Sequence, residues 1–160
     1  MVFTRTKEDA MSRIIADLRE LTHQIEQISE EVARKYHIDH LAGPQGHVLI
    51  YLDKHQNQEI YVKDIENALC ISKSVASNLV KRMEKNGFID IIPSQTDKRY
   101  KQVVITDKGL EKLPLVKECR KDIENYFFKE ITREEFLTVR KVIDQLKQNM
   151  LDYKKGEDHA

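Results

Sequence analysis

The sequence predicts a mainly α-helical fold with one small β-hairpin. Three observations support this prediction. Apolar residues recur at helical spacing near both ends of the chain, two short helical patterns with a brief break between them occupy the middle, and two β-rich runs flank a polar loop directly afterwards. A length of 160 residues fits a single domain over residues 1–160, because a chain of this size can bury a substantial core.

A long amphipathic helix is expected over residues 7–36. Its apolar residues alternate in spacing between three and four positions, as in a helix that buries one narrow stripe. The stripe comprises Met11, Ile14, Leu18, Leu21, Ile25, Ile28 and Val32. This regularity over several turns is typical of helices that pair with another helix.

Two further helices are expected after the hairpin. The helical pattern over residues 107–129 contains Pro114, which predicts a kink or a late start. The pattern over residues 133–153 follows Thr132, with Glu135 three positions later, which is the signature of a capping box.

The apolar stripes of these terminal helices predict a homodimer. Stripes at both ends of a short chain cannot all be buried in one small core, so pairing with a second copy is favoured over an intramolecular bundle. We therefore expect residues 7–40 and 107–153 to form a helical dimerisation region. Residues 154–160 are expected to form a disordered tail.

The middle of the chain predicts a helix-turn-helix. Gly43 and Pro44 mark a helix start, and a short helix with apolar residues from Val62 to Leu69 follows. A second helix, capped by Ser72, should end at Asn86 and Gly87. Its expected buried residues are Val75, Leu79, Val80 and Met83. Two helices separated by only a few residues form a helix-turn-helix pattern.

The hairpin completes a winged helix. Residues 88–92 and 101–106 are β-rich, and residues 93–100 between them form a turn-rich polar loop with a basic tip. A helix-turn-helix followed at once by such a hairpin predicts a winged-helix DNA-binding lobe over residues 44–106. The hairpin is its wing.

The charge distribution favours double-stranded DNA as the partner. The whole chain has a net charge of zero, but residues 72–105 contain seven basic and three acidic residues, a local charge of +4. Binding to a polyanion depends on this local field more than on the total charge.

The polar side of the second helix supplies most of the candidate DNA contacts. Ser77 and Asn78 are short polar residues that can read base edges in the major groove. Ser72 and the backbone amides of the helix start can bind phosphate, and basic residues farther along suit phosphate contacts. The candidates are Ser72, Lys73, Ser74, Ser77, Asn78, Lys81, Arg82 and Lys85. Each alone could be a helix cap or a solvated surface residue, but their order and spacing together favour DNA.

The wing loop supplies the remaining candidates. Lys98 and Arg99 lie at or near its tip, and an arginine can enter a narrow minor groove. Asp97 is expected to hold Arg99 in orientation. The alternative is a surface ion pair of little energetic value.

Several segments resemble the MarR family of bacterial transcription regulators. They are "GPQGHVLIYL", "LVKRMEKNGFI" and the wing pattern Asp97-Lys98-Arg99, which Val104-Ile105-Thr106 and Gly109 follow. The resemblance covers about residues 9–153. It implies a homodimer on a pseudopalindromic operator, usually repression, and often release of DNA by a small ligand, an oxidant or a metal. Val62 stands where the family usually has a Ser or Thr cap.

Responses to small molecules leave several alternatives open. The resemblance implies a ligand pocket that His23, His47 and Tyr51 could line. A metal site could use His37, Asp39, His40 and His47, but these lack the spacing of a zinc site, so we predict no metal. Cys70 could sense oxidants near a helix start, although burial is the favoured prediction for both Cys70 and Cys119.

Other functional classes are disfavoured. With five glycines and no catalytic constellation or phosphate loop, the sequence predicts neither an enzyme nor a bound cofactor. The longest apolar runs are too short to cross a bilayer and the N-terminus lacks a secretory pattern, so no membrane partner and a cytoplasmic location are expected. A winged-helix adaptor that binds proteins instead of DNA is the main alternative, but it predicts an apolar or acidic recognition face.

Overall fold

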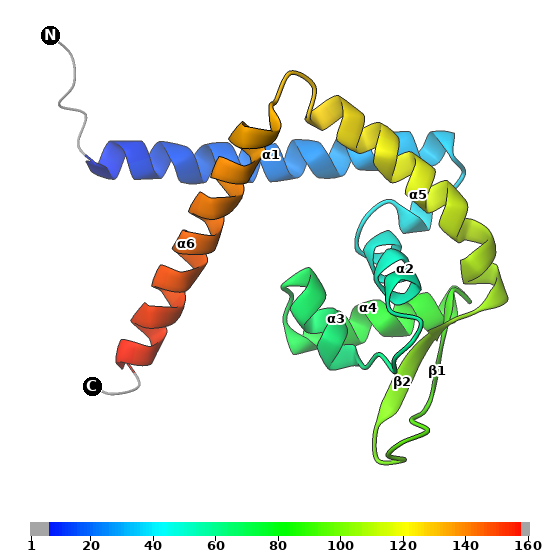
Figure 1. Cartoon of the computed structure of the whole chain (residues 1–160). Coiled ribbons are helices and arrows are strands. Elements are labelled where there is room, and N and C mark those ends of the chain that lie inside the picture. The colour runs from blue at the N-terminus through cyan, green and yellow to red at the C-terminus, as the bar shows by residue number, and fades with distance from the viewer. Residues whose placement is uncertain (1–6, 158–160) are drawn as a thin grey trace, which may run out of the picture. The chain divides into compact units, whose positions relative to one another are not determined.

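The computed structural model describes residues 7–157 and is drawn in Figure 1. The chain divides after Ile123 into two compact units. The first contains α1 (Lys7–Lys35), the 3-10 helix η1 (Asp39–Leu41), α2 (Pro44–Lys54), α3 (Val62–Leu69), α4 (Lys73–Lys85), β1 (Ile89–Pro93), β2 (Lys101–Ile105) and most of α5 (Asp107–Phe127). The second contains the end of α5 and all of α6 (Arg133–Glu157). The mainly helical fold with one hairpin is confirmed, and the extent of a single domain stays a prediction.

The two helices of the helix-turn-helix begin at well-defined caps. The Tyr61 backbone N–H donates to Oδ2 of Asp64 at 2.8 Å, so the start of α3 is satisfied without the Ser or Thr cap. Ser72 Oγ accepts from the Val75 backbone N–H at 3.3 Å and caps α4, as predicted. After α4, Gly87 adopts a φ of 81°, a conformation that favours glycine.

The core lies where α2, α3, α4 and the hairpin meet. Its largest fully buried side chains are Val48, Leu49, Ile65, Leu79, Val80, Met83 and Ile89. The prediction that Val75 is buried is wrong, because its side chain is 48% exposed while neighbouring Ala76 is completely buried. The other three predicted residues, Leu79, Val80 and Met83, are buried, so the buried face of α4 differs from the predicted face only in its first turn.

The wing is a two-stranded antiparallel hairpin. Ile89 pairs with Ile105 and Pro93 pairs with Lys101. The segment before α3 extends the pairing, because Tyr61 bridges to Gln102 and the Val103 backbone N–H donates to the Ile60 carbonyl at 2.7 Å. The base of the wing is therefore fixed to the α2–α3 connection.

α5 starts directly after the hairpin. Thr106 Oγ1 accepts from the Gly109 backbone N–H at 3.1 Å, so the helix begins at Asp107 and passes through Pro114. The predicted late start is wrong. A side chain at Gly109 is sterically excluded, since a Cβ would lie 2.3 Å from the Phe88 carbonyl oxygen.

α6 shows the predicted capping box. The Thr132 N–H donates to Glu135 Oε2 at 2.9 Å, and the Glu135 N–H donates to Thr132 Oγ1 at 3.2 Å. The helix continues to Glu157, so a disordered tail is wrong for residues 154–157. Lys154 and Lys155 in the last turn favour this extension, because cations stabilise a helix C-terminus. Residues 158–160 lie outside the described residues.

The apolar stripes of the terminal helices are exposed in the single chain. Met11, Ile14, Leu18 and Leu21 on α1 are each 51–55% exposed. On α6, the stripe of Val139, Ile143, Leu146, Met150 and Tyr153 is 40–69% exposed. Of the helices in the described part of the chain, none has the length and apolarity needed to cross a bilayer.

Candidate nucleic-acid interface

α4 presents a polar and basic face to solvent. Opposite its buried residues lie exposed side chains that can meet DNA, as the sequence predicts. They are Ser72, Lys73, Ser74, Asn78, Lys81, Arg82 and Lys85. Ser77 is half-buried, so Asn78 is the better placed of the two predicted base readers. Ser72 and Ser74 lie in the first turn with their hydroxyl oxygens 3.2 Å apart.

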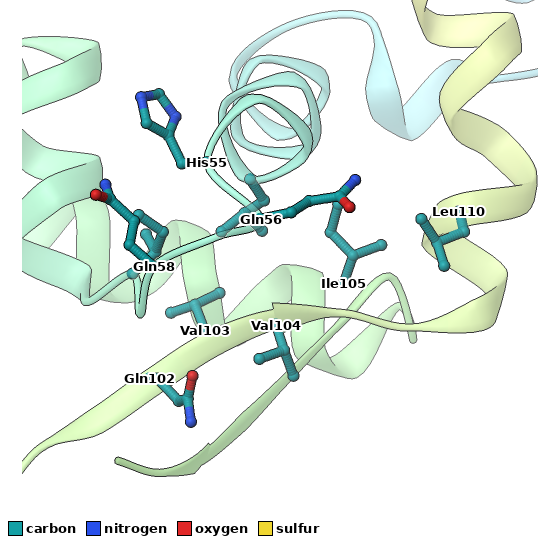
Figure 2. A pocket seen from close by; sticks show the side chains of 10 residues that line it. His55, Gln56, Gln58, Gln102, Val103, Val104, Ile105 and Leu110 are labelled. Carbon is teal, nitrogen blue, oxygen red and sulfur yellow. The ribbon is translucent and has the colours of Figure 1, made fainter. Parts of the chain in front are cut away.

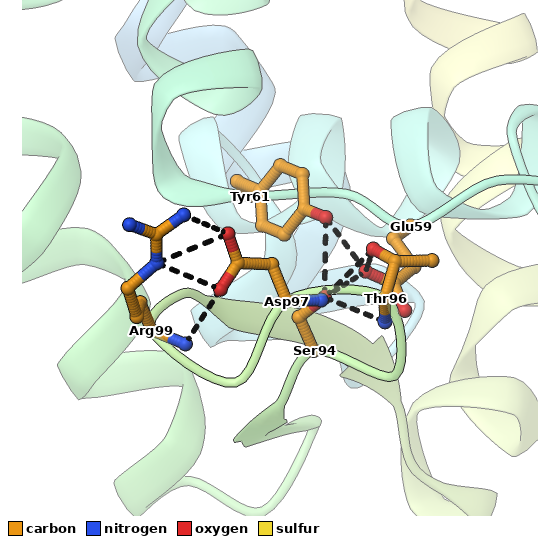
Figure 3. Close-up of polar contacts among 6 residues, drawn as sticks. All are labelled: Glu59, Tyr61, Ser94, Thr96, Asp97 and Arg99. Carbon is orange, nitrogen blue, oxygen red and sulfur yellow. Dashed lines mark hydrogen bonds and ion pairs between the residues drawn. The ribbon is translucent and has the colours of Figure 1, made fainter.

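The wing carries a bidentate ion pair at its tip. Arg99 donates through Nε to Oδ1 of Asp97 at 3.0 Å and through a terminal nitrogen to Oδ2 at 2.7 Å (Figure 3). The Arg99 N–H also donates to Oδ1 at 3.1 Å. These hydrogen bonds lower the pKa of Asp97. The predicted pairing of Asp97 with Arg99 is confirmed, and 85% of the arginine side chain is still exposed to solvent.

A carboxylate that the sequence did not single out holds the wing loop. Glu59, in the α2–α3 connection, accepts from Ser94 Oγ at 2.5 Å, from the Tyr61 hydroxyl at 2.6 Å and from the Gln95 backbone N–H at 2.7 Å. Thr96 Oγ1 donates to the same carboxylate at 3.3 Å (Figure 3). The hydrogen bonds from Ser94 and Tyr61 lower the pKa of Glu59 from 4.5 to about 2.

Ser94 extends this network toward the tip of the wing. Its side chain is buried, and its Oγ accepts from the backbone N–H groups of Thr96 at 3.2 Å and Asp97 at 3.1 Å. Only one residue separates Asp97 from Arg99. The network thus joins Glu59, between α2 and α3, to the wing residues that position Arg99. A single acidic residue in a polar turn gives no local signal for a contact 35 residues away in the sequence.

Comparisons with known proteins place this arrangement in a family. The MarR family profile matches residues 41–99. The chain is 46% identical to the heme sensor protein PefR from Streptococcus agalactiae in its structure with heme, covering 85% of this chain and 92% of that one with a TM-score of 0.62. The chain belongs to the MarR family of transcription regulators.

Other MarR-type proteins are more distant. The transcriptional repressor IacR from Pseudomonas putida is 26% identical over 121 residues, which cover 76% of this chain and 70% of IacR. The MepR–DNA complex from S. aureus is 21% identical, covers 83% of this chain and 93% of that one, and has a TM-score of 0.71. The MepR structure shows the shared fold. The relatives that carry a functional name are regulators, not enzymes.

The predicted pocket residues of this MarR-family chain do not line one common cavity. His23 faces a shallow groove on α1, whereas Tyr51 lines a cavity of about 400 Å³ with Arg120. His47 lines that cavity and also a larger one of about 500 Å³. The larger cavity is lined by residues of α1, of the η1 segment, of the start of α2 and of α4. Its wall includes His40, Leu79 and Arg82.

A further cavity lies at the end of α2, beside the wing. It measures about 320 Å³ and is lined by the end of α2, by β2 and by the first turn of α5 (Figure 2). His55, Gln56 and Gln102 supply part of its polar wall. None of the predicted pocket residues lies there.

The two cysteines of this MarR-family chain differ in environment. Cys119 on α5 is buried as predicted, and burial raises the pKa of its thiol. Cys70 is exposed, so the prediction of its burial is wrong. It ends α3 with a φ of 55°, and this left-handed position turns the side chain away from the core. Within residues 7–157, no group of three or more His, Cys, Asp or Glu side chains is arranged to hold a metal ion.

Among the side-chain contacts that join α5 to the rest of the first unit, two involve aspartates. The Tyr36 hydroxyl donates to Oδ2 of Asp122, which raises the pKa of Tyr36 to about 12. Lys117 Nζ donates to Oδ2 of Asp53 on α2 at 2.5 Å, and this bond lowers the pKa of Asp53. The Lys117–Asp53 ion pair therefore joins α5 to α2 of the DNA-binding lobe.

Proposed function

We propose that the protein binds a pseudopalindromic operator as a homodimer in the cytoplasm and represses transcription. α4 would lie in the major groove, with Asn78 at base edges and Lys73, Lys81, Arg82 and Lys85 at phosphates. Lys98 and Arg99 of the wing would reach the adjacent minor groove. The observation that carries this proposal is the exposed polar and basic face of α4 next to a wing whose arginine is held by Asp97.

The exposed stripes of α1 and α6 support dimerisation. A stripe with about half of each large apolar side chain exposed is unfavourable in water, and each buried methylene contributes about 0.8 kcal/mol. A second copy of the chain offers the same stripes with matching spacing. Pairing would place two recognition helices on one DNA duplex, which is the geometry that reads an inverted repeat.

Selection from random DNA tests this proposal. Purified protein is mixed with a pool of random duplexes at near-physiological salt, and the bound fraction is sequenced, with Arg99→Ala treated in parallel. We expect an enriched inverted repeat with half-sites about one helical turn apart. No enrichment by either protein would instead support the adaptor function.

We propose heme as the small-molecule effector. Support comes from the 46% identity to a heme sensor and from the 500 Å³ cavity. Its wall combines imidazoles, apolar residues and a guanidinium with the acidic residues Glu26, Glu30 and Asp39. His40 or His47 would supply a nitrogen ligand to the iron, and Arg82 would pair with a propionate. Bound heme would supply an iron centre that takes such a ligand. Ile25 provides apolar surface for the macrocycle.

Titration with hemin tests the effector. We expect a shifted Soret band at one hemin per chain or per dimer, and release of the selected duplex at the same hemin concentration. His40→Ala and His47→Ala identify the ligand, because loss of an iron ligand changes the Soret position. An unshifted Soret band in the wild-type protein would contradict the proposal.

A further inference from the structure

Val75 stands out on the recognition helix because it is a large apolar side chain exposed to solvent. Within the lobe of residues 44–106, only Val75 and Tyr100 are large hydrophobic residues on the exposed side, at 48% and 58%. Tyr100 lies near the Tyr61 ring, with 6.0 Å between ring centroids. Val75 has no such aromatic neighbour and lies on α4 itself.

The position of Val75 is set by the helix cap. Its backbone N–H donates to Ser72 Oγ at 3.3 Å, which places Val75 in the first turn of α4. The N-terminal residues of a recognition helix are those that meet base edges. Asn78, three residues later, lies on the same side of the helix, because residues three apart are surface neighbours.

Its chemistry differs from that of every exposed neighbour in this turn. Ser72, Lys73 and Ser74 are polar, so Val75 alone offers methyl groups. Of the groups exposed in the major groove, the thymine C5-methyl is the one that prefers an apolar contact. A β-branched side chain in a helix is also held in one main rotamer, so little conformational freedom is lost when it packs.

We propose that Val75 is a specificity-determining residue that reads a thymine methyl group in each half-site. Isolated apolar residues are common on protein surfaces, and exposure alone would not carry this inference. The inference is carried by three observations together. Val75 lies in the first turn of α4, it directly precedes the buried Ala76, and it lies on the same side of the helix as Asn78. The inference rests on the proposed operator binding.

Removing methyl groups from either side tests the contact. The selected duplex is prepared with each thymine of one half-site replaced in turn by deoxyuridine, which lacks only the methyl group. Affinities of the wild-type protein and Val75→Ala are measured by fluorescence anisotropy. At one thymine we expect deoxyuridine to weaken wild-type binding about fourfold, the factor for one buried methyl group. In Val75→Ala the same replacement should change the affinity by less than half as much.

Two controls separate this inference from the proposed function. Lys85→Ala, which removes a phosphate contact, should bind both duplexes more weakly but keep the fourfold difference between them. Val75→Ala should fold, because alanine favours the helix and the side chain lies outside the core. If a specific duplex is selected but no thymine shows a loss that depends on residue 75, the inference is overturned while operator binding stands. If no duplex is selected, operator binding itself fails.

Discussion

The carboxylate of Glu59 accepts a hydrogen bond from the buried Ser94 hydroxyl at 2.5 Å, across 35 residues of sequence. Through Ser94, the α2–α3 connection reaches the backbone of Thr96 and Asp97, and Asp97 in turn holds Arg99 (Figure 3). Arg99 of the wing is thus positioned by two carboxylates in series. Glu59, the first of these two carboxylates, is far from the wing in sequence but adjacent to it in the fold.

Glu59→Gln should weaken DNA binding. Removing a negative charge from a DNA-binding protein favours association by itself, whereas losing the anchor of the wing loop opposes it. An amide retains one acceptor but presents N–H groups toward hydroxyls that now donate, so the loop loses order. We expect a loss of affinity of about twofold to tenfold, the cost of ordering one or two side chains on binding. Fluorescence anisotropy on the selected duplex measures it.

Glu111→Gln is a matched control for this experiment. Glu111 is an exposed carboxylate on α5, away from the wing network. Its neutralisation should leave the affinity unchanged or slightly higher. Equal affinities of Glu59→Gln and Glu111→Gln would show that the network does not position the wing.

The pKa of Glu59 predicts how stability responds to acid. The pKa falls from 4.5 in the unfolded chain to about 2 in the folded protein, so the unfolded state binds more protons. The contribution of Glu59 is therefore fully present above about pH 4.5 and is lost as the pH falls toward 2. Urea unfolding at pH 5 and pH 3 should show a larger drop for the wild-type protein than for Glu59→Gln. Parallel drops would contradict the shifted pKa.

Local signals in the sequence were sufficient for most of the fold. Helical spacing, the Thr132–Glu135 box, the Ser72 cap and the turn at Gly87 each depend on residues within a few positions. The structure confirms all four. The Asp97–Arg99 pair also joins residues two apart, so it could be predicted before any fold was known.

The predictions that failed concern features that depend on tertiary packing. Val75 and Ala76 are neighbours, and apolar spacing on a short helix favours the larger one as the buried residue. In the structure it is the small side chain, Ala76, that is completely buried. Cys70 was expected inside because cysteine usually is, but its position after the last turn of α3 exposes it. The partners of Glu59 are distant in sequence, and no periodic pattern marks them.

Arg99→Ala should reduce both the affinity for DNA and its dependence on salt. If Arg99 replaces one counterion in the minor groove, the slope of log affinity against log salt should fall by about one. Arg99→Lys keeps the charge but loses the bidentate bond to Asp97, so it should restore the salt slope better than the affinity. Anisotropy titrations at several salt concentrations measure both values. An unchanged slope in Arg99→Ala would show that Arg99 does not contact DNA.

Leu18→Glu should separate the dimer. Leu18 is 51% exposed in the centre of the α1 stripe, and a carboxylate there would be buried without a partner in a paired helix. We expect a monomer by sedimentation velocity at micromolar concentration, with helix content preserved in circular dichroism. Ala16→Glu, on the other side of the same helix, should leave the dimer intact. A dimeric Leu18→Glu protein would exclude the α1 stripe as the interface.

Asn78→Ala should relax base preference at particular positions of the operator. Asn78 is exposed on the outer face of α4, and an asparagine amide can pair with both N6 and N7 of adenine. Loss of that pair should lower discrimination at one base pair per half-site by about 1–3 kcal/mol. Single base-pair replacements in the selected duplex, measured with wild-type and variant protein, locate the position.

Ser77→Ala should have a smaller effect than Asn78→Ala because Ser77 is half-buried. Lys81→Ala should weaken binding to every duplex alike, and the same uniform loss from Asn78→Ala would mean that Asn78 contacts the phosphate backbone instead of the bases.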